Sequence, residues 1–445
     1  MKGNKMKNIQ ILLILIITII LYSCNSNSTK EQLVEIDKPK IEQAQEYFKE
    51  LKDFLKKEDG KLWNYQLYGP LLLVNQNDRF IIANEADNKG ILTKNGEVYI
   101  GTLPNEIIIA NTAFDWNGKR WTMVMLPLPS DYNERLNLLT HELFHGIQPK
   151  IGFSDLFETQ SNHLDEKNGR IYLKLELEAL KKALTSDNVD KQQAHIHNSL
   201  MFRYYRYMLF PNAKEAENTL ELNEGLAEYT GSILSDRTDD ELTEHYIQAI
   251  NNFYETQTFV RSFAYVTIPV YGYLINLQDV SWNKKISTNT NLIDFISEFF
   301  NITTPENLKD IVNKIELDYN FDEISIYETN RDNERQNLIA EYEIKFINNS
   351  TLTIRFENMK IGFDPRNIMP LKDIGTVYPN MKITDNWGIL TVENGALLGQ
   401  NWDKVTVSEP TEITDKIIKG DGWKLEINND WELIKIEKNY ILKKN

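Results

Sequence analysis

The feature that most constrains this chain is a pair of histidines, His141 and His145, inside the pentad HELFH. Apolar side chains recur around the pentad at helical spacing, at Leu136, Leu139, Leu143 and Ile147. Asp131 or Asn133 can cap the start of this helix, and Pro149 ends it. Residues four apart lie on one face of a helix, so the two imidazoles can hold one metal ion together.

A third ligand is needed, because catalytic zinc takes three protein ligands and keeps one position open. The only cysteine, Cys24, is close to the N-terminus. The segment LELNEGLAEY at 220–229 has helical periodicity and places Glu224 and Glu228 on one face. Two carboxylates on one face repel, unless a cation lies against them. This segment is therefore the best source of the third ligand, although by itself it also fits a solvated acidic helix.

HELFH followed by LNEGLAEY resembles the gluzincin metallopeptidases, and most closely the aminopeptidase N family, where HExxH precedes an LNEGFAxY-type helix. Thermolysin-like enzymes carry a related NExxxD pattern. The resemblance implies that His141, His145 and Glu224 bind one Zn²⁺ ion. It also implies that Glu142 is the general base. Glu228 is expected to accept a hydrogen bond from a liganding histidine and fix its orientation.

The spacing of the two motifs departs from these families, in which a short segment joins them. Here 78 residues lie between His145 and Glu224. Apolar residues at helical spacing predict two helices in this insertion, over 172–184 and 195–209. We expect a helical hairpin that leaves the motif helices adjacent, and it could also cover the cleft. His195 and His197 are two apart, so they face apart on a helix and form a poor metal pair.

A later segment, FAYVTIPVYG at 263–272, is similar to the aminopeptidase segment whose tyrosine donates to the oxyanion. The similarity points to Tyr265 as a second catalytic residue, with Tyr271 as the next choice. A buried aromatic residue in a helical core explains either tyrosine equally well. The amine-binding GxMEN motif of the aminopeptidases has no clear counterpart. Aminopeptidase and endopeptidase activity therefore both remain open.

The N-terminus has the pattern of a bacterial lipoprotein signal. Three lysines precede an apolar run over 11–22, which is too short for a stable membrane anchor. Ser23 precedes Cys24, so we expect cleavage before Cys24, lipid attachment to its thiol, and a membrane-anchored position outside the cytoplasm. A simple secretory signal is the alternative. A single cysteine allows no intramolecular disulfide.

The rest of the chain predicts an α+β protein with a gluzincin-like catalytic domain, in which a mixed sheet adjoins helices that carry HExxH. Asn117-Gly118 predicts a hairpin between strands near 107–116 and 121–126. An edge strand there could pair with an extended peptide or serve the sheet alone. Period-two alternation near the C-terminus predicts a small antiparallel β domain, either a partner-binding module or a passive one. The expected parts are a signal peptide over 1–23, a lipidated cysteine and tether over 24–40, a helix and sheet subdomain over 41–132, a helical zinc-binding subdomain over 133–332, and the β domain over 333–445.

The net charge of −16 argues against nucleic-acid binding and against electrostatic adhesion to anionic lipids. The sequence thus predicts a zinc-dependent peptidase that acts on a peptide or protein substrate. The alternative is a catalytically silent surface lipoprotein that keeps the same fold for binding or scaffolding.

Overall fold

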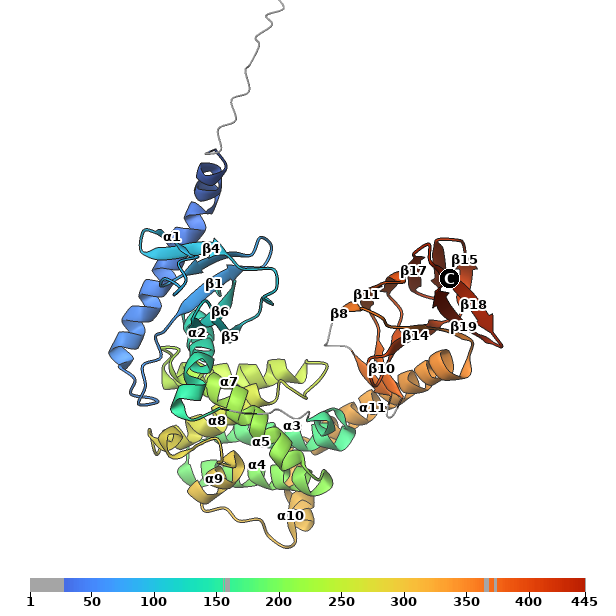
Figure 1. Cartoon of the computed structure of the whole chain (residues 1–445). Coiled ribbons are helices and arrows are strands. Elements are labelled where there is room, and N and C mark those ends of the chain that lie inside the picture. Colours follow the sequence, from blue (N-terminus) through green and yellow to red (C-terminus); the bar gives the residue numbers. More distant parts are fainter. Residues whose placement is uncertain (1–27, 155, 157–160, 364–367, 372–373, 445) are drawn as a thin grey trace, which may run out of the picture.

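The computed structural model describes residues 28–154, 156, 161–363, 368–371 and 374–444, with side chains from Lys40 onward. The expected signal peptide over 1–23 and Cys24 lie outside these residues. The chain is an α+β protein in which a sheet subdomain adjoins a helical subdomain, and a long helix leads to a β sandwich (Figure 1). Among the described residues, no helix combines the length and the apolar character needed to cross a bilayer.

The sheet subdomain is a six-stranded mixed sheet with strand order β3-β4-β2-β1-β6-β5. Helix α1 runs over Ser28–Glu58, so it begins inside the segment expected to be a tether. Apolar residues of α1 share one core with one face of the sheet and with the helices. Strands β1 and β6 are parallel, and the other pairs are antiparallel. The strands are β1 Leu71–Asn75, β2 Phe80–Ala83, β3 Thr93–Asn95, β4 Val98–Thr102, β5 Thr112–Trp116 and β6 Lys119–Leu126.

The predicted hairpin between β5 and β6 is confirmed. Trp116 pairs with Lys119 across a two-residue turn, and both turn residues, Asn117 and Gly118, have positive φ. This is the backbone that Asn-Gly favours in tight hairpins. Strand β5 is the last in the sheet, so one of its edges has no partner among the described strands.

The helical subdomain contains the predicted helix with HELFH and the two helices predicted in the insertion. Helix α2 carries HELFH and packs against β6, β5 and α6, and α6 packs against α8. Asp131 is the N-cap of α2, and Pro149 lies in the short helix that follows it. The main helices are α2 Tyr132–Ile147, α3 Lys167–Leu184, α4 Val189–Leu209, α5 Ala213–Leu220, α6 Leu226–Ile233, α7 Asp239–Tyr254, α8 Ala264–Asn276, α9 Leu292–Phe299, α10 Leu308–Ile315 and α11 Phe321–Glu343. The short ones are η1 Gln148–Ile151, η2 Asn162–Asp165, η3 Glu221–Gly225, η4 Trp282–Lys285, η5 Glu316–Tyr319 and η6 Ile344–Asn348.

The C-terminal β domain is a sandwich whose two sheets enclose a common apolar core. The sheet orders are β18-β19-β7-β14-β13-β10-β9 and β15-β16-β17-β12-β11-β8. The strands are β7 Thr351–Arg355, β8 Lys360–Phe363, β9 Met369–Leu371, β10 Gly375–Tyr378, β11 Met381–Asp385, β12 Gly388–Val392, β13 Ala396–Gly399, β14 Lys404–Ser408, β15 Pro410–Ile413, β16 Ile417–Gly420, β17 Trp423–Ile427, β18 Trp431–Ile436 and β19 Asn439–Lys444.

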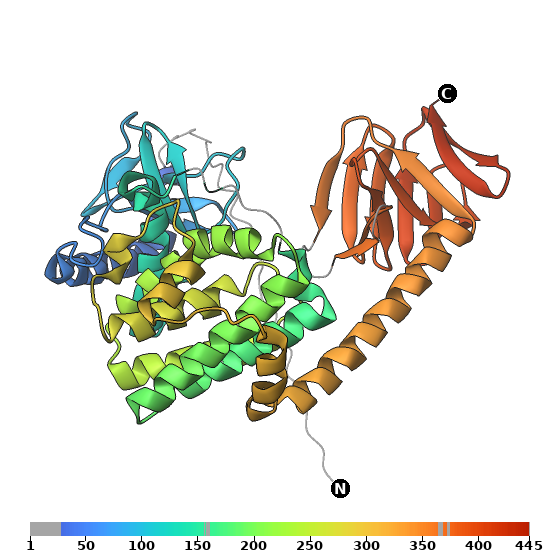
Figure 2. The ribbon, with the colours of Figure 1, turned by 90° about the horizontal axis from the view of Figure 1, so that it is seen from below.

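Two details of this domain differ from the expectation. Helix α11 passes position 333, and η6 continues the helical backbone to Asn348, so the first strand begins only at Thr351 (Figure 2). The sandwich is mostly antiparallel, but β19 pairs with β7 in parallel. A long connection brings the last strand back beside the first, and strand periodicity alone does not encode that direction.

Candidate metal centre

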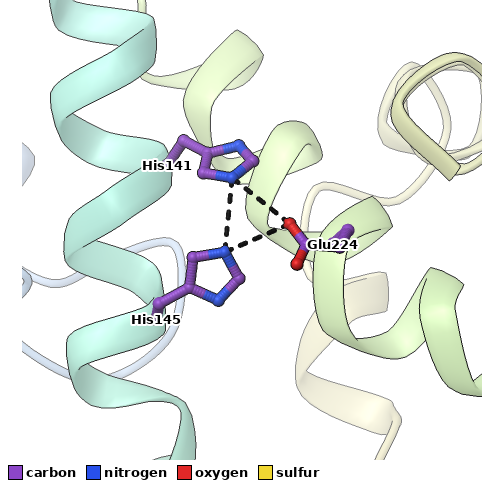
Figure 3. Close-up of side chains that lie close together, drawn as sticks. All are labelled: His141, His145 and Glu224. Carbon is purple, nitrogen blue, oxygen red and sulfur yellow. Dashed lines mark hydrogen bonds and ion pairs between the residues drawn. The ribbon is translucent and has the colours of Figure 1, made fainter. Parts of the chain in front are cut away.

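Three donor atoms from two helical segments converge on one point (Figure 3). His141 Nε2 and His145 Nε2 are 3.3 Å apart. Glu224 Oε2 is 3.7 Å from the first nitrogen and 3.4 Å from the second. A tetrahedral ion with bonds of about 2.0–2.1 Å separates its ligand atoms by about 3.3–3.4 Å. The three donors therefore stand at nearly the spacing that one small tetrahedral cation requires.

The far side of each imidazole is fixed by a hydrogen bond. His141 Nδ1 lies 2.8 Å from Glu228 Oε2, and His145 Nδ1 lies 2.8 Å from Gln148 Oε1. The Gln148 amide is oriented in turn, because its Nε2 donates to the carbonyls of Leu222 and Asn223. Carboxylate and carbonyl oxygens only accept, so each histidine donates through Nδ1. Both Nε2 lone pairs then face the shared point, as metal binding requires.

The expected role of Glu228 agrees with this geometry, whereas Gln148 was not predicted. Glu228 also accepts a hydrogen bond of 3.0 Å from Asn137 Nδ2 through its second oxygen, Oε1. Asn137 lies one turn before His141 in α2. Gln148 follows HELFH by three residues and resembles an ordinary helix-terminal residue in the sequence. Only the folded position of 222–223 beside it shows that it links the two halves of the centre.

The charges around the centre favour a cation. Burial opposes the charged form of His141, but hydrogen bonds to Glu224 and Glu228 raise its pKa to about 10. Burial acts against the Glu224 carboxylate too, yet the two histidines hold its pKa well below the usual range. These shifts show that the surrounding carboxylates stabilise positive charge at this point. A divalent cation would supply that charge and leave both imidazoles neutral.

Glu142 lies beside the histidines and is 6% exposed. Burial raises its pKa, and His141 and His145 oppose that change. Within the described part of the chain, its Oε2 is buried and has no hydrogen-bond partner. A buried carboxylate oxygen without a partner is costly in a purely structural site. It fits a group that receives its partner from a bound water or substrate.

The segment that carries Glu224 is a π-helical turn, η3, between α5 and α6. The sequence predicts one regular helix over 220–229, and this departure was missed. Gly225 permits close packing here, since a β-carbon at this position would lie 2.9 Å from Ile268 Cβ and 3.2 Å from the Ala264 carbonyl of α8. Wide turns of this kind occur often at functional sites. No residue type in LNEG distinguishes such a turn from an α-helix.

Tyr265 lies at the centre, and Tyr271 does not. The Tyr265 hydroxyl donates to Glu224 Oε2 at 2.6 Å, and its ring stacks on His141 with centroids 5.7 Å apart. Burial and the neighbouring Glu224 raise the pKa of Tyr265, so its hydroxyl stays protonated as a donor. Tyr271 is fully buried, with its hydroxyl on Glu176 and Ser199. His195 bonds the Tyr319 hydroxyl and is not part of the centre.

The donors open into a cavity of about 1000 Å³. One side is the edge strand region, with Thr112 and Ala113 of β5 and Arg120 of β6. Phe153 and Leu156, from the chain after α2, also line it. No described residue of the α3–α4 hairpin lines it, so the hairpin does not cover the cleft, which the sequence had left as one possibility. Residues of β5 and the three donor residues thus line the same cavity.

Comparisons with protein-family models, with curated proteins and with solved structures found no match for this chain. What the centre can do is therefore argued from its own geometry.

Proposed function

We propose that this chain is a zinc-dependent peptidase of the gluzincin type. The observation that carries the proposal is the set of three donor atoms at tetrahedral spacing next to the unpartnered carboxylate of Glu142. Two imidazoles and one carboxylate are the ligand set of catalytic zinc sites that keep one position open. Glu228 and Gln148 accept hydrogen bonds from the Nδ1 atoms of the two imidazoles and fix their orientation. Such fixed imidazoles are typical of a site that holds its metal ion rigidly.

Zinc held by His141, His145 and Glu224 would polarise the scissile carbonyl and lower the pKa of a water. Glu142 would accept a proton from that water through its free Oε2, and would pass it to the leaving nitrogen. Its location beside the histidines, on the wall of the open cavity, suits both transfers. Tyr265 would turn its hydroxyl from Glu224 to the oxyanion that develops on the carbonyl oxygen.

The substrate would be a peptide or an extended segment of a protein. Thr112 and Ala113 of the terminal strand β5 line the cavity, and an edge strand can add a peptide strand through main-chain hydrogen bonds. We also propose that the chain is exported and held at a bacterial membrane by lipid on Cys24. The support is the pattern of lysines, apolar run and Ser23-Cys24 at the N-terminus.

The test is cleavage of a peptide library by the wild-type protein and by Glu142→Gln, with zinc measured in both. We expect cleavage by the wild type only, inhibition by a chelator, and equal zinc in both proteins. Free and N-terminally blocked peptides in the same library would separate aminopeptidase from endopeptidase activity. Cleavage by Glu142→Gln at the wild-type rate would contradict the proposed base. A wild type that binds zinc and cleaves nothing would favour the silent lipoprotein.

A further inference from the structure

A fully buried group of charged side chains lies behind the metal centre. It consists of Arg203 and Arg206 of α4 with Glu176 of α3, Glu217 of α5 and Glu221 of η3, and we name it the arginine–glutamate cluster. All five side chains are 0% exposed. Burial of so many charges is costly unless every charge is paired with good geometry. The proposed reaction uses none of these residues.

Within the cluster, Arg203 holds the first residue of the π-helical turn. Its Nη1 and Nη2 donate to the two carboxylate oxygens of Glu221 at 2.9 and 2.8 Å. Its Nε donates to Glu176 at 2.6 Å, so the guanidinium is fixed from the other side. Thr267 of α8 adds a hydrogen bond of 2.6 Å to Glu221 Oε1. Glu221 is thus clamped between α4 and α8.

Arg206 binds the two other glutamates of the cluster, Glu217 and Glu176. It bonds Glu217 through Nε and Nη2 at 2.9 and 2.7 Å, and Glu176 through Nη1 at 2.8 Å. His163 Nε2 adds a contact of 2.7 Å to Glu217. The hairpin is therefore joined to α5 and to η3 by charge-assisted hydrogen bonds. Such forked pairs are directional as well as strong.

Glu224 stands three residues after Glu221 in the same turn. Because η3 is wider than an α-helical turn, its side chains depart from the regular phase of α5 and α6, and contacts from outside the helix can set which way Glu224 faces. We propose that Arg203 positions Glu224 for metal binding through its forked hydrogen bond to Glu221. The inserted hairpin then serves as a clamp on the third ligand. This inference rests on the proposed zinc site.

A second buried ion group offers a matched control. Arg170 of α3 donates to Glu328 of α11 at 2.8 Å, and Lys174 pairs with the same carboxylate. Arg170 and Glu328 are 1% and 0% exposed. Among the described residues, the hydrogen bonds and ion pairs of this group do not reach η3. A merely structural role predicts similar consequences for the two arginines, whereas a positioning role sets Arg203 apart.

The experiment measures the zinc dissociation constant by competition with a chromophoric chelator, together with the melting temperature. Arg203→Lys keeps the charge but loses the fork, and Arg170→Lys is the same substitution in the control group, where Arg170 bonds Glu328 through Nε. We expect Arg203→Lys to weaken zinc binding about tenfold, the lower end of the loss for groups that hydrogen-bond a metal ligand directly, because Arg203 acts through Glu221. Arg170→Lys should lower the melting temperature and leave zinc affinity unchanged. In a Glu224→Ala background, Arg203→Lys should cause no further loss.

The results separate the two claims. A wild-type chain that binds no zinc rejects the proposed function itself. Wild-type zinc affinity in Arg203→Lys overturns the positioning role while the zinc site stands. Equal losses in Arg203→Lys and Arg170→Lys overturn it too, because they show a general effect of stability. Should Arg203→Lys not fold, Thr267→Val removes the hydrogen bond from the other side, and unchanged affinity there would overturn the proposal.

Discussion

Replacing Gly231 by alanine should separate the two helices that carry the candidate metal centre. Gly231 lies in α6 where this helix packs against α2. It faces Asn137, which lies one helical turn before His141. An added β-carbon would lie 2.7 Å from Asn137 Nδ2, 2.8 Å from the Asn137 carbonyl oxygen and 3.2 Å from His141 Cβ. The carbonyl belongs to the backbone of α2, so a side-chain rotation cannot relieve that contact.

The size of the effect follows from these distances. Ordinary contacts of such a carbon begin at 3.4 Å, so α2 must shift by about 0.6 Å. Metal–ligand bonds tolerate about 0.2 Å. A helix shift of this size moves both imidazoles relative to Glu224 by more than that tolerance. Overpacking should also cost about 1–3 kcal/mol of the free energy of unfolding.

We expect Gly231→Ala to fold, to bind zinc at least about tenfold more weakly and to lose peptide cleavage in proportion. Chelator competition gives the affinity, and thermal unfolding gives the stability. Gly362→Ala is the matched control, because nothing lies within 4 Å of its added carbon. A folded Gly231→Ala protein with wild-type zinc affinity would refute the account of how the two helices set the spacing of the donors.

Two further substitutions test the groups around the proposed zinc ion. Glu228→Gln keeps the shape but removes the charge that orients His141, and zinc affinity should fall about 10–100-fold in the chelator competition; unchanged affinity would show that this contact is dispensable. Tyr265→Phe removes one hydroxyl, and kcat for peptide cleavage should fall about 10²–10³-fold while zinc stays bound. A kcat equal to that of the wild type would exclude the hydroxyl as a donor in the reaction.

The sequence predicts the local elements of this protein well, because periodicity reports which face of each segment is buried. The helix with HELFH, the hairpin of the insertion, the Asn117-Gly118 turn and the alternating strands of the β domain all have such patterns. The pairing of Glu228 with His141 also follows from a motif, since the chemistry of an oriented imidazole demands an acceptor.

Features that depend on how distant elements meet were not predictable in this way. Arg203 and Arg206 look like solvated residues on a helix, and only the fold brings three glutamates to them. The turn η3 packs on α8, and its π-helical form has no compositional signal in the sequence. Helix α11 has few buried residues, so its polar sequence suggested an early end to the helical subdomain. The α3–α4 hairpin could be predicted as a unit, but its position behind the metal centre depends on contacts between distant elements and could not be predicted.

The zinc content of the purified chain, by elemental analysis, tests the central claim most directly. Wild-type protein should hold one zinc ion per chain, and Glu224→Ala should hold little after dialysis, since two imidazoles alone make a weak site. Glu215→Ala, a substitution of an exposed glutamate of α5, should keep the wild-type content. Equal zinc in the wild type and in Glu224→Ala would contradict the third ligand, and a wild type without zinc would contradict the metal centre as a whole.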